Sequence, residues 1–297
     1  MTSFNRRKPK RAGPSLKKML RFKRPSAAYQ PHGDAGPAGP RPRRRGIYLL
    51  PNAFTTAALF CGFYAIVMGM NRNFEFASIA IFAAMILDSL DGRVARMTNT
   101  QSEFGAQYDS LSDMVSFGAA PALVAYEWSL RGMGKLGWLA AFVYCAGAAL
   151  RLARFNTNIA VVDKRYFQGL PSPAAAAMVA GFIWLMTDLG ISGDGLKWFA
   201  WTITIYGGLT MVSNVPFYSF KDINLRKSVP FIVAFLIVLG FVLVSSDPPK
   251  FFFGLFVTYG LSGYVVYAWR FFKGKPVSIV QTSVDDHDDK LHPDTDH

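Results

Sequence analysis

Four aspartates and two glycines recur at helix-like intervals within one 26-residue stretch of the chain. The stretch runs from Asp88 to Asp113 and has the pattern D-x2-D-G-x2-A-R-x8-G-x3-D-x3-D. Its acids lie where long apolar segments begin and end, and a carboxylate at such a place is costly and usually functional. Carboxylates that face one spot repel one another and need cations to be stable together. We therefore expect a cation site here.

Helical periodicity places the four acids on two faces that can meet. If the apolar segment near 74–94 is a helix that continues through Arg96, one of its faces carries Asp88, Asp91, Gly92 and Ala95, since successive helix residues point about 100° apart. Asp109 and Asp113 share a face of the next helix, about one turn apart. The polar connector at 98–102 lets the two helices return side by side, so we expect the carboxylates to converge between them. Helix capping alone would not explain these shared faces or the small residues beside the acids.

The absence of histidine from the apolar part of the chain narrows the choice of metal. All histidines lie in the terminal tails, so hard oxygen ligands remain, and these favour Mg²⁺, Mn²⁺ or Ca²⁺. Four carboxylates suffice for two cations about 3.5–4 Å apart, an arrangement that suits attack at phosphorus. Gly92, Ala95 and Gly105 leave room for a flat ligand beside the acids. Arg96 offers a planar fork to phosphate.

The elements that must position this site are apolar segments, each long enough to cross a bilayer, which takes about 17–25 residues. They fall near 48–70, 74–94, 106–128, 136–155, 172–189, 196–215, 229–246 and 251–271. A water-soluble fold cannot bury so many runs of this length. We expect an all-α polytopic membrane protein with about eight transmembrane helices.

The net charge of +13 belongs to one tail. Residues 1–46 contain 14 Lys or Arg and one acid, so the rest of the chain is neutral and nothing suggests a nucleic-acid partner. This Pro- and Gly-rich tail is predicted to be disordered, either as a solvated end or with a short basic helix at 15–24 on anionic lipid. We expect a membrane domain at 47–272 and an acidic tail at 273–297.

Loop charges predict the orientation in the membrane. With an even number of spans both tails lie on one side, and that side holds most of the loop Lys and Arg. Lys and Arg accumulate on the cytoplasmic side. The termini and the aspartate cluster are therefore expected to be cytoplasmic, in a protein of the cell (inner) membrane.

The aspartate pattern resembles the signature of the CDP-alcohol phosphatidyltransferases, and every signature position is filled. The resemblance implies a homodimeric membrane enzyme in which an alcohol displaces CMP from a CDP-linked lipid. It implies that Asp88, Asp91, Asp109 and Asp113 hold two divalent cations, Mg²⁺ or Mn²⁺. It also implies that Asp113 takes the proton from the attacking hydroxyl.

The same resemblance assigns the small residues and the arginine to the nucleotide and its phosphates. The matching positions are Gly92, Ala95, Arg96 and Gly105. At the start of the first segment, Asn52 and Thr55 are further candidates for this site. Asn52 either reaches the nucleotide or only caps the helix that follows Pro51.

Motifs outside the signature resemble the branch of the family that uses L-serine, over about residues 47–225. This branch converts CDP-diacylglycerol and L-serine to phosphatidylserine and CMP. The candidate acceptor-binding residues are Arg151, Arg154, Asn156, Gln168 and Gly169. An arginine pair can bind a carboxylate bidentately, although both arginines could instead face lipid head groups and Gly169 could serve only in a turn.

Three alternatives remain open at the level of the sequence. A sister enzyme would use glycerol 3-phosphate, inositol or another polar alcohol. A divalent-cation transporter should place its acids near the middle of the bilayer, whereas these lie at one end of their segments. A non-catalytic scaffold would have no need for four converging carboxylates.

Overall fold

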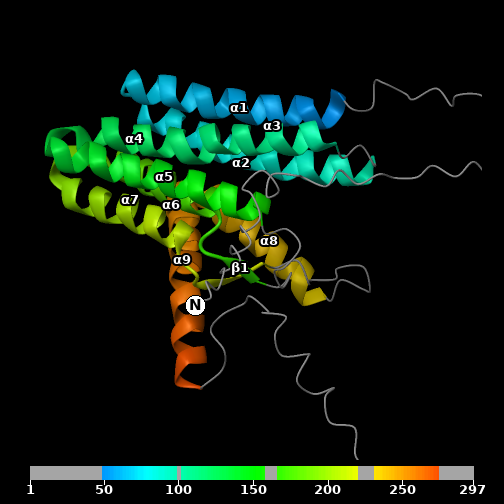
Figure 1. Ribbon diagram of the computed structural model, residues 1–297. Helices are drawn as coiled ribbons and strands as arrows, with labels where there is room; N and C mark the ends of the chain where they lie inside the picture. Colours follow the sequence, from blue (N-terminus) through cyan, green and yellow to red (C-terminus); the bar gives the residue numbers. More distant parts are fainter. Residues whose placement is uncertain (1–48, 99–101, 158–165, 220–230, 274–297) are drawn as a thin grey trace, which may run out of the picture. The chain divides into compact units, whose positions relative to one another are not determined.

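Figure 1 shows the computed structural model of the chain. The structure describes residues 49–98, 102–157, 166–219 and 231–273, all of which belong to one unit at 44–297. The predictions for the basic tail, and nearly all of those for the acidic tail, fall outside these residues.

Helices make up most of the described chain, so the expected helical class is confirmed. The elements are α1 (Leu49–Met70), α2 (Phe74–Met97), α3 (Glu103–Asp113), a π-helix η3 (Met114–Ala119), α4 (Ala120–Trp128), the 3-10 helix η4 (Leu130–Met133), α5 (Lys135–Thr157), α6 (Ser172–Asp188), the 3-10 helix η5 (Gly193–Leu196), α7 (Lys197–Val212), α8 (Phe231–Ser246) and α9 (Pro248–Phe272). Each predicted apolar segment coincides with helical structure.

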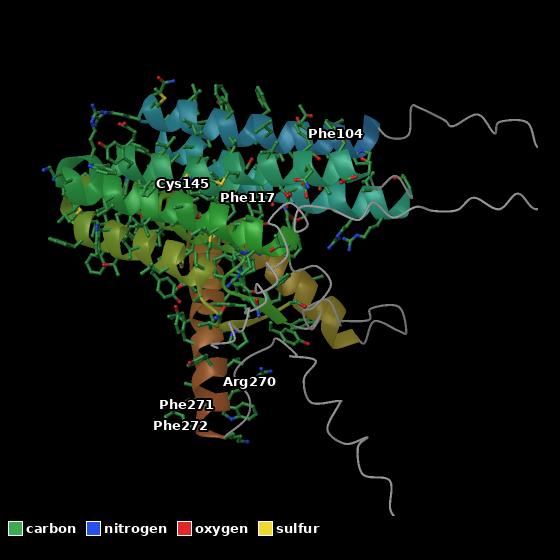
Figure 2. The ribbon with its side chains drawn as sticks, in the orientation of Figure 1. Phe104, Phe117, Cys145, Arg270, Phe271 and Phe272 are labelled. Carbon is green, nitrogen blue, oxygen red and sulfur yellow. The ribbon has the colours of Figure 1, made fainter. Side chains whose placement is uncertain are left out.

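Three helices of the described chain are long and apolar enough to cross a membrane. They are Pro51–Met70, Lys135–Thr157 and Pro248–Phe272. Large apolar side chains point outward along them, among them Phe60 in α1 and the pair Phe271 and Phe272 at the end of α9 (Figure 2). Such extensive exposed apolar surface suits lipid contact.

The first helices hold the part of the chain that carries the aspartate pattern. α1 and α2 run side by side (Figure 1), and α3 and η3 also pack on α1. The approach of α1 to η3 is close at Gly62, where an added Cβ would lie 2.5 Å from Ser116 Oγ. Ser116 Oγ in turn donates a hydrogen bond of 3.1 Å to the carbonyl of Ala58. A side chain at Gly62 would therefore force these elements apart.

The core is built largely from small residues. α6 contacts α2, α7 and α9, and its alanines Ala174–Ala177 are buried. α5 and α7 meet where a Cβ at Gly147 would lie 2.4 Å from Gly208 O. Small residues let helix backbones approach closely, which favours dispersion contacts between helices in lipid.

A short antiparallel sheet joins two segments that the sequence did not predict as strands. β1 (Tyr166–Gln168) pairs with β2 (Pro216–Tyr218), and Phe167 lies opposite Phe217. Strands of three residues are too short to show an alternating pattern, so periodicity could not reveal them.

Candidate functional site

The acids of α2 and α3 come together as the pattern predicted. Carboxylate oxygens of Asp88, Asp91 and Asp109 lie within 4.8 Å of one another. Asp113 lies within hydrogen-bonding reach of Asp88. The predicted continuation of the helical segment at 74–94 through Arg96 is also confirmed, because α2 ends at Met97. This continuation keeps Asp88 and Asp91 on one face.

A buried threonine from α1 orients one of these carboxylates. Thr55 Oγ1 donates to Asp91 Oδ2 at 2.7 Å and also lies 3.2 Å from the carbonyl of Pro51. Ser112, between the two acids of α3, donates to Thr55 O at 3.1 Å. α1 is thereby tied to both acidic helices. The sequence pointed to Thr55 but gave Ser112 no role.

A cavity of about 460 Å³ opens beside the cluster. Its lining consists of Pro51, Asn52, Thr55, Asp91, Gly92, Ala95, Arg96, Ser102, Gly105, Ala106, Asp109 and Phe155. The residues predicted for the nucleotide site thus surround one space, although their contact with a nucleotide stays a prediction. Asn52 lies inside α1, which begins at Leu49, so it is not the N-cap of this helix.

Two glycines and an arginine shape the walls of this cavity. A Cβ at Gly92 would meet open space, and one at Gly105 would lie 3.1 Å from Ser102 Oγ and 3.6 Å from Asn52 Oδ1. Ser102 caps α3 by accepting a hydrogen bond of 3.0 Å from the Gly105 N–H. Arg96 Nε donates to Gly92 O at 2.9 Å, which tethers its guanidinium to the same turn. The cavity wall therefore includes helix backbone at the glycines, and the Arg96 guanidinium lies at its edge.

The donor set fits a hard divalent cation. The candidate metal ligands that converge among the described residues are carboxylate oxygens, the ligand type that Mg²⁺ and Mn²⁺ prefer. Asp109 Oδ1 is buried and has no hydrogen-bond partner among the described residues. A buried acceptor of this kind is costly unless something binds it. A cation between the acids would satisfy it and reduce their mutual repulsion.

Arg151 is the predicted acceptor residue whose charge interacts with one of the clustered acids, Asp113. The Arg151 guanidinium interacts electrostatically with Asp113 and with Tyr259. Nη1 donates to Ser172 Oγ at 2.9 Å, whereas Nε is buried without a partner among the described residues. Ser172 lies three residues after the candidate Gly169 in the sequence, but no sequence signal identifies Tyr259.

Arg154 lies against the end of α7 and the sheet. Its terminal nitrogens donate to the carbonyls of Gln168, Val212 and Ser213 and to Asn214 Oδ1, at 2.9–3.2 Å. Gly169 has φ of 76°, and a Cβ there would lie 2.3 Å from Met211 O. The alternative that Gly169 serves in a turn therefore has a structural basis. Contact of Arg154, Gln168 and Gly169 with the acceptor stays a prediction.

The end of α5 adds two residues to the surroundings of the acids. Asn156 Nδ2 donates to Ser110 Oγ at 3.1 Å, next to Asp109 in α3. Phe155 lines the cavity. Phe155 was not among the residues predicted for the site, although it lies between the candidates Arg154 and Asn156 in the sequence.

Comparison with known proteins agrees with this geometry. Residues 48–206 match the family described as CDP-alcohol phosphatidyltransferase. The CDP-diacylglycerol–serine O-phosphatidyltransferase of Helicobacter pylori is 37% identical over 217 residues, which cover 72% of this chain and 90% of the relative. The enzyme of that name from Methanocaldococcus jannaschii is 35% identical over 187 residues, 63% of this chain and 82% of the relative.

A eukaryotic relative shows the same similarity. The CDP-diacylglycerol–serine O-phosphatidyltransferase of Saccharomyces cerevisiae is 34% identical over 206 residues, 64% of this chain and 67% of the relative. The family match covers more than half of the chain and includes the whole aspartate pattern. With its acids converging beside one cavity, the chain belongs to the CDP-alcohol phosphatidyltransferase family.

Proposed function

We propose that this protein transfers the phosphatidyl group from CDP-diacylglycerol to L-serine, giving phosphatidylserine and CMP. One observation carries the reaction type: three carboxylates converge beside a cavity lined by the signature glycines and arginine. The names of relatives at 34–37% identity support serine as the acceptor.

The four aspartates would hold two divalent cations, Mg²⁺ or Mn²⁺. When bound, such cations neutralise charge on the transferred phosphoryl group and on the leaving CMP. Thr55 fixes the orientation of Asp91 through their hydrogen bond. Asn52, Gly92, Ala95, Arg96 and Gly105 form the proposed nucleotide and phosphate site.

Asp113 is the proposed general base. A carboxylate oxygen of Asp113 accepts the proton from the serine hydroxyl as the serine oxygen attacks the β-phosphorus. A new bond forms between that oxygen and phosphorus, and the bond from the β-phosphorus to the bridging oxygen breaks, so CMP leaves. A general base must lie within hydrogen-bonding reach of the proton that it takes.

Arg151 is the proposed partner for the serine carboxylate. It lies near Asp113, and its buried Nε has no other partner among the described residues. An arginine binds a carboxylate through charge-assisted hydrogen bonds. This placement would bring the hydroxyl of a bound serine toward the general base.

We further propose that the eight helical segments span the inner membrane with both termini and the site on the cytoplasmic side. The distribution of loop Lys and Arg supports this orientation. The family resemblance supports a homodimer. A cytoplasmic site would meet the head group of the lipid donor while its acyl chains stay in the bilayer.

The decisive experiment measures CMP release by purified protein with CDP-diacylglycerol, Mg²⁺ or Mn²⁺, and a panel of alcohols. We expect CMP only when serine is added, loss of turnover with a chelator, and recovery with either metal. Release with glycerol 3-phosphate or inositol in place of serine would assign the sister activity instead.

A variant tests the role of the acids. Asp109→Asn should abolish turnover, because it removes a negative ligand from the cluster and leaves the helix intact. A matched Asp194→Asn variant, at an exposed acid that pairs with Lys197, should keep full activity. Near-normal turnover in Asp109→Asn would refute the two-cation site.

A further inference from the structure

We propose that Phe155 is the surface on which the cytosine base of the CDP group stacks. The inference rests on the proposed function and adds to it a binding residue that lies outside the aspartate signature. Phe155 is the aromatic side chain among the described residues that line the cavity.

The composition of the cavity wall supports this role. Its other apolar members, such as Pro51, Ala95 and Ala106, are small, and the rest are polar or glycine. Phe155 is 52% exposed, so its ring has free surface to offer. A planar base gains contact and dispersion energy against such a ring.

The positions of the charged groups indicate which part of the ligand meets the ring. Asp91 and Asp109 form the acidic part of the wall, so the pyrophosphate and its cations belong there. Gly92 has open space where a side chain would be. The base extends away from the phosphates, and Phe155 is the flat apolar group of the wall that can receive it.

Both neighbours of Phe155 hold its backbone in place. Arg154 donates to carbonyls at the end of α7, and Asn156 donates to Ser110 in α3. Successive helix residues point about 100° apart, so these two bonds fix the helix and leave Phe155 its own direction. A helix end that is held in place before binding loses little backbone entropy when the base arrives.

Stacking of this kind contributes affinity without choosing the base, because every base has a π face. We therefore expect Phe155 to distinguish ligands that carry a base from those that do not. The direct test compares CMP with ribose 5-phosphate as inhibitors or as ligands in a binding assay, using the full-length protein with Mg²⁺.

Phe155→Leu should weaken CMP binding about 5- to 100-fold, with a similar rise in the KM for CDP-diacylglycerol and little change in kcat. Binding of ribose 5-phosphate should change less than twofold. Phe155→Trp should restore CMP affinity to that of the wild type. Phe104→Leu is the matched control, because Phe104 is an exposed aromatic residue of α3 (Figure 2) that is not in the cavity lining.

Equal weakening of both ligands by Phe155→Leu would overturn the proposal, because it would indicate a structural role. Unchanged CMP affinity would overturn it as well, and so would an equal loss in Phe104→Leu, which would indicate a general need for aromatic residues at the surface. These outcomes concern CMP binding alone, so they are distinct from a failure to use serine.

Discussion

At the scale of single residues, Thr55 links α1 to the clustered acids. It is buried, its hydroxyl donates to Asp91, and its carbonyl accepts from Ser112. A carboxylate that must bind a cation in one orientation benefits from such a fixed partner. In the proposed reaction Thr55 would therefore act through Asp91 as well as lining the cavity.

Thr55→Val should lower kcat about tenfold and raise the metal concentration needed for half activity. The change keeps the side-chain volume but removes a hydrogen bond to a charged group, worth about 1.5–3 kcal/mol. CMP release over a Mg²⁺ titration measures both effects. Thr56→Val is the matched control, because Thr56 makes its bonds to Asn52 O and Tyr108 on the exposed side. Equal metal dependence in both variants would contradict the role of Thr55.

Arg154 provides a second prediction at this scale. Arg154→Ala should lower the free energy of unfolding by about 3 kcal/mol, because several carbonyls at the end of α7 lose a charged donor. Arg154→Lys should recover only part of the loss, since one ammonium cannot reproduce the planar fork. Thermal unfolding in detergent measures the order of stability, wild type above Lys above Ala. A Lys variant as stable as the wild type would show that charge alone suffices.

At the scale of elements, the π-helix η3 begins directly after Asp113. Its Phe117, which is labelled in Figure 2, is fully buried. The Phe117 carbonyl accepts a hydrogen bond of 3.2 Å from Tyr144 OH in α5. A π-helix adds a residue to the turn and is frequent at functional sites. Here it changes the helical register between the acids of α3 and the buried face of α4.

Inserting one alanine after Val115 should abolish activity while the protein remains folded. The turn of η3 already holds an extra residue, so the inserted one is taken up as α-helix and rotates the acids of α3 by about 100° relative to α4. CMP release together with circular dichroism and thermal unfolding tests this expectation. Activity near that of the wild type would mean that the register of η3 does not position Asp109 and Asp113.

Gly62→Ala should destabilise the contact between α1 and η3. The new methyl group would lie 2.6 Å from Ser116 Cα, and overpacking of this kind costs about 1–3 kcal/mol. Gly254→Ala in α9 is the control, because a Cβ there meets open space. The melting temperature should fall in the first variant and hold or rise in the second. Equal melting temperatures would show that α1 can shift without cost.

The convergence of the acids could be predicted from the sequence, whereas the contacts of Thr55 and Arg154 could not, for physical reasons. Asp88, Asp91 and Asp109 could be brought together from spacing alone, because helical periodicity fixes which residues share a face. The bond from Thr55 to Asp91 joins residues 36 positions apart, and only packing determines such a contact. The role of Arg154 was equally hidden, because it depends on a sheet too short to leave a pattern.

At the scale of the whole molecule, loop charges and apolar length support one arrangement in the membrane. Three described helices meet the length and composition of a span. α2 falls short on composition, because it carries Asp88 and Asp91, and α3 falls short on length, because it has 11 residues, although both pack with α1. The carboxylates of the proposed site thus lower the apolar character of α2.

Reporter fusions test this arrangement. Alkaline phosphatase inserted after Arg72, between α1 and α2, should be active, because we expect that turn to face away from the cytoplasm. Green fluorescent protein inserted at residue 100 should fluoresce, because it folds in the cytoplasm. The reverse pattern would invert the proposed orientation and would move the site to the opposite face.

The cavity draws its wall from distant parts of the chain, from Pro51 in α1 to Phe155 in α5. During synthesis the aspartates therefore emerge well before the helix that closes their site. A nascent chain that ends after α4 would carry the whole signature without Phe155 and Asn156. The order of translation thus delays a complete cavity until α5 has been made.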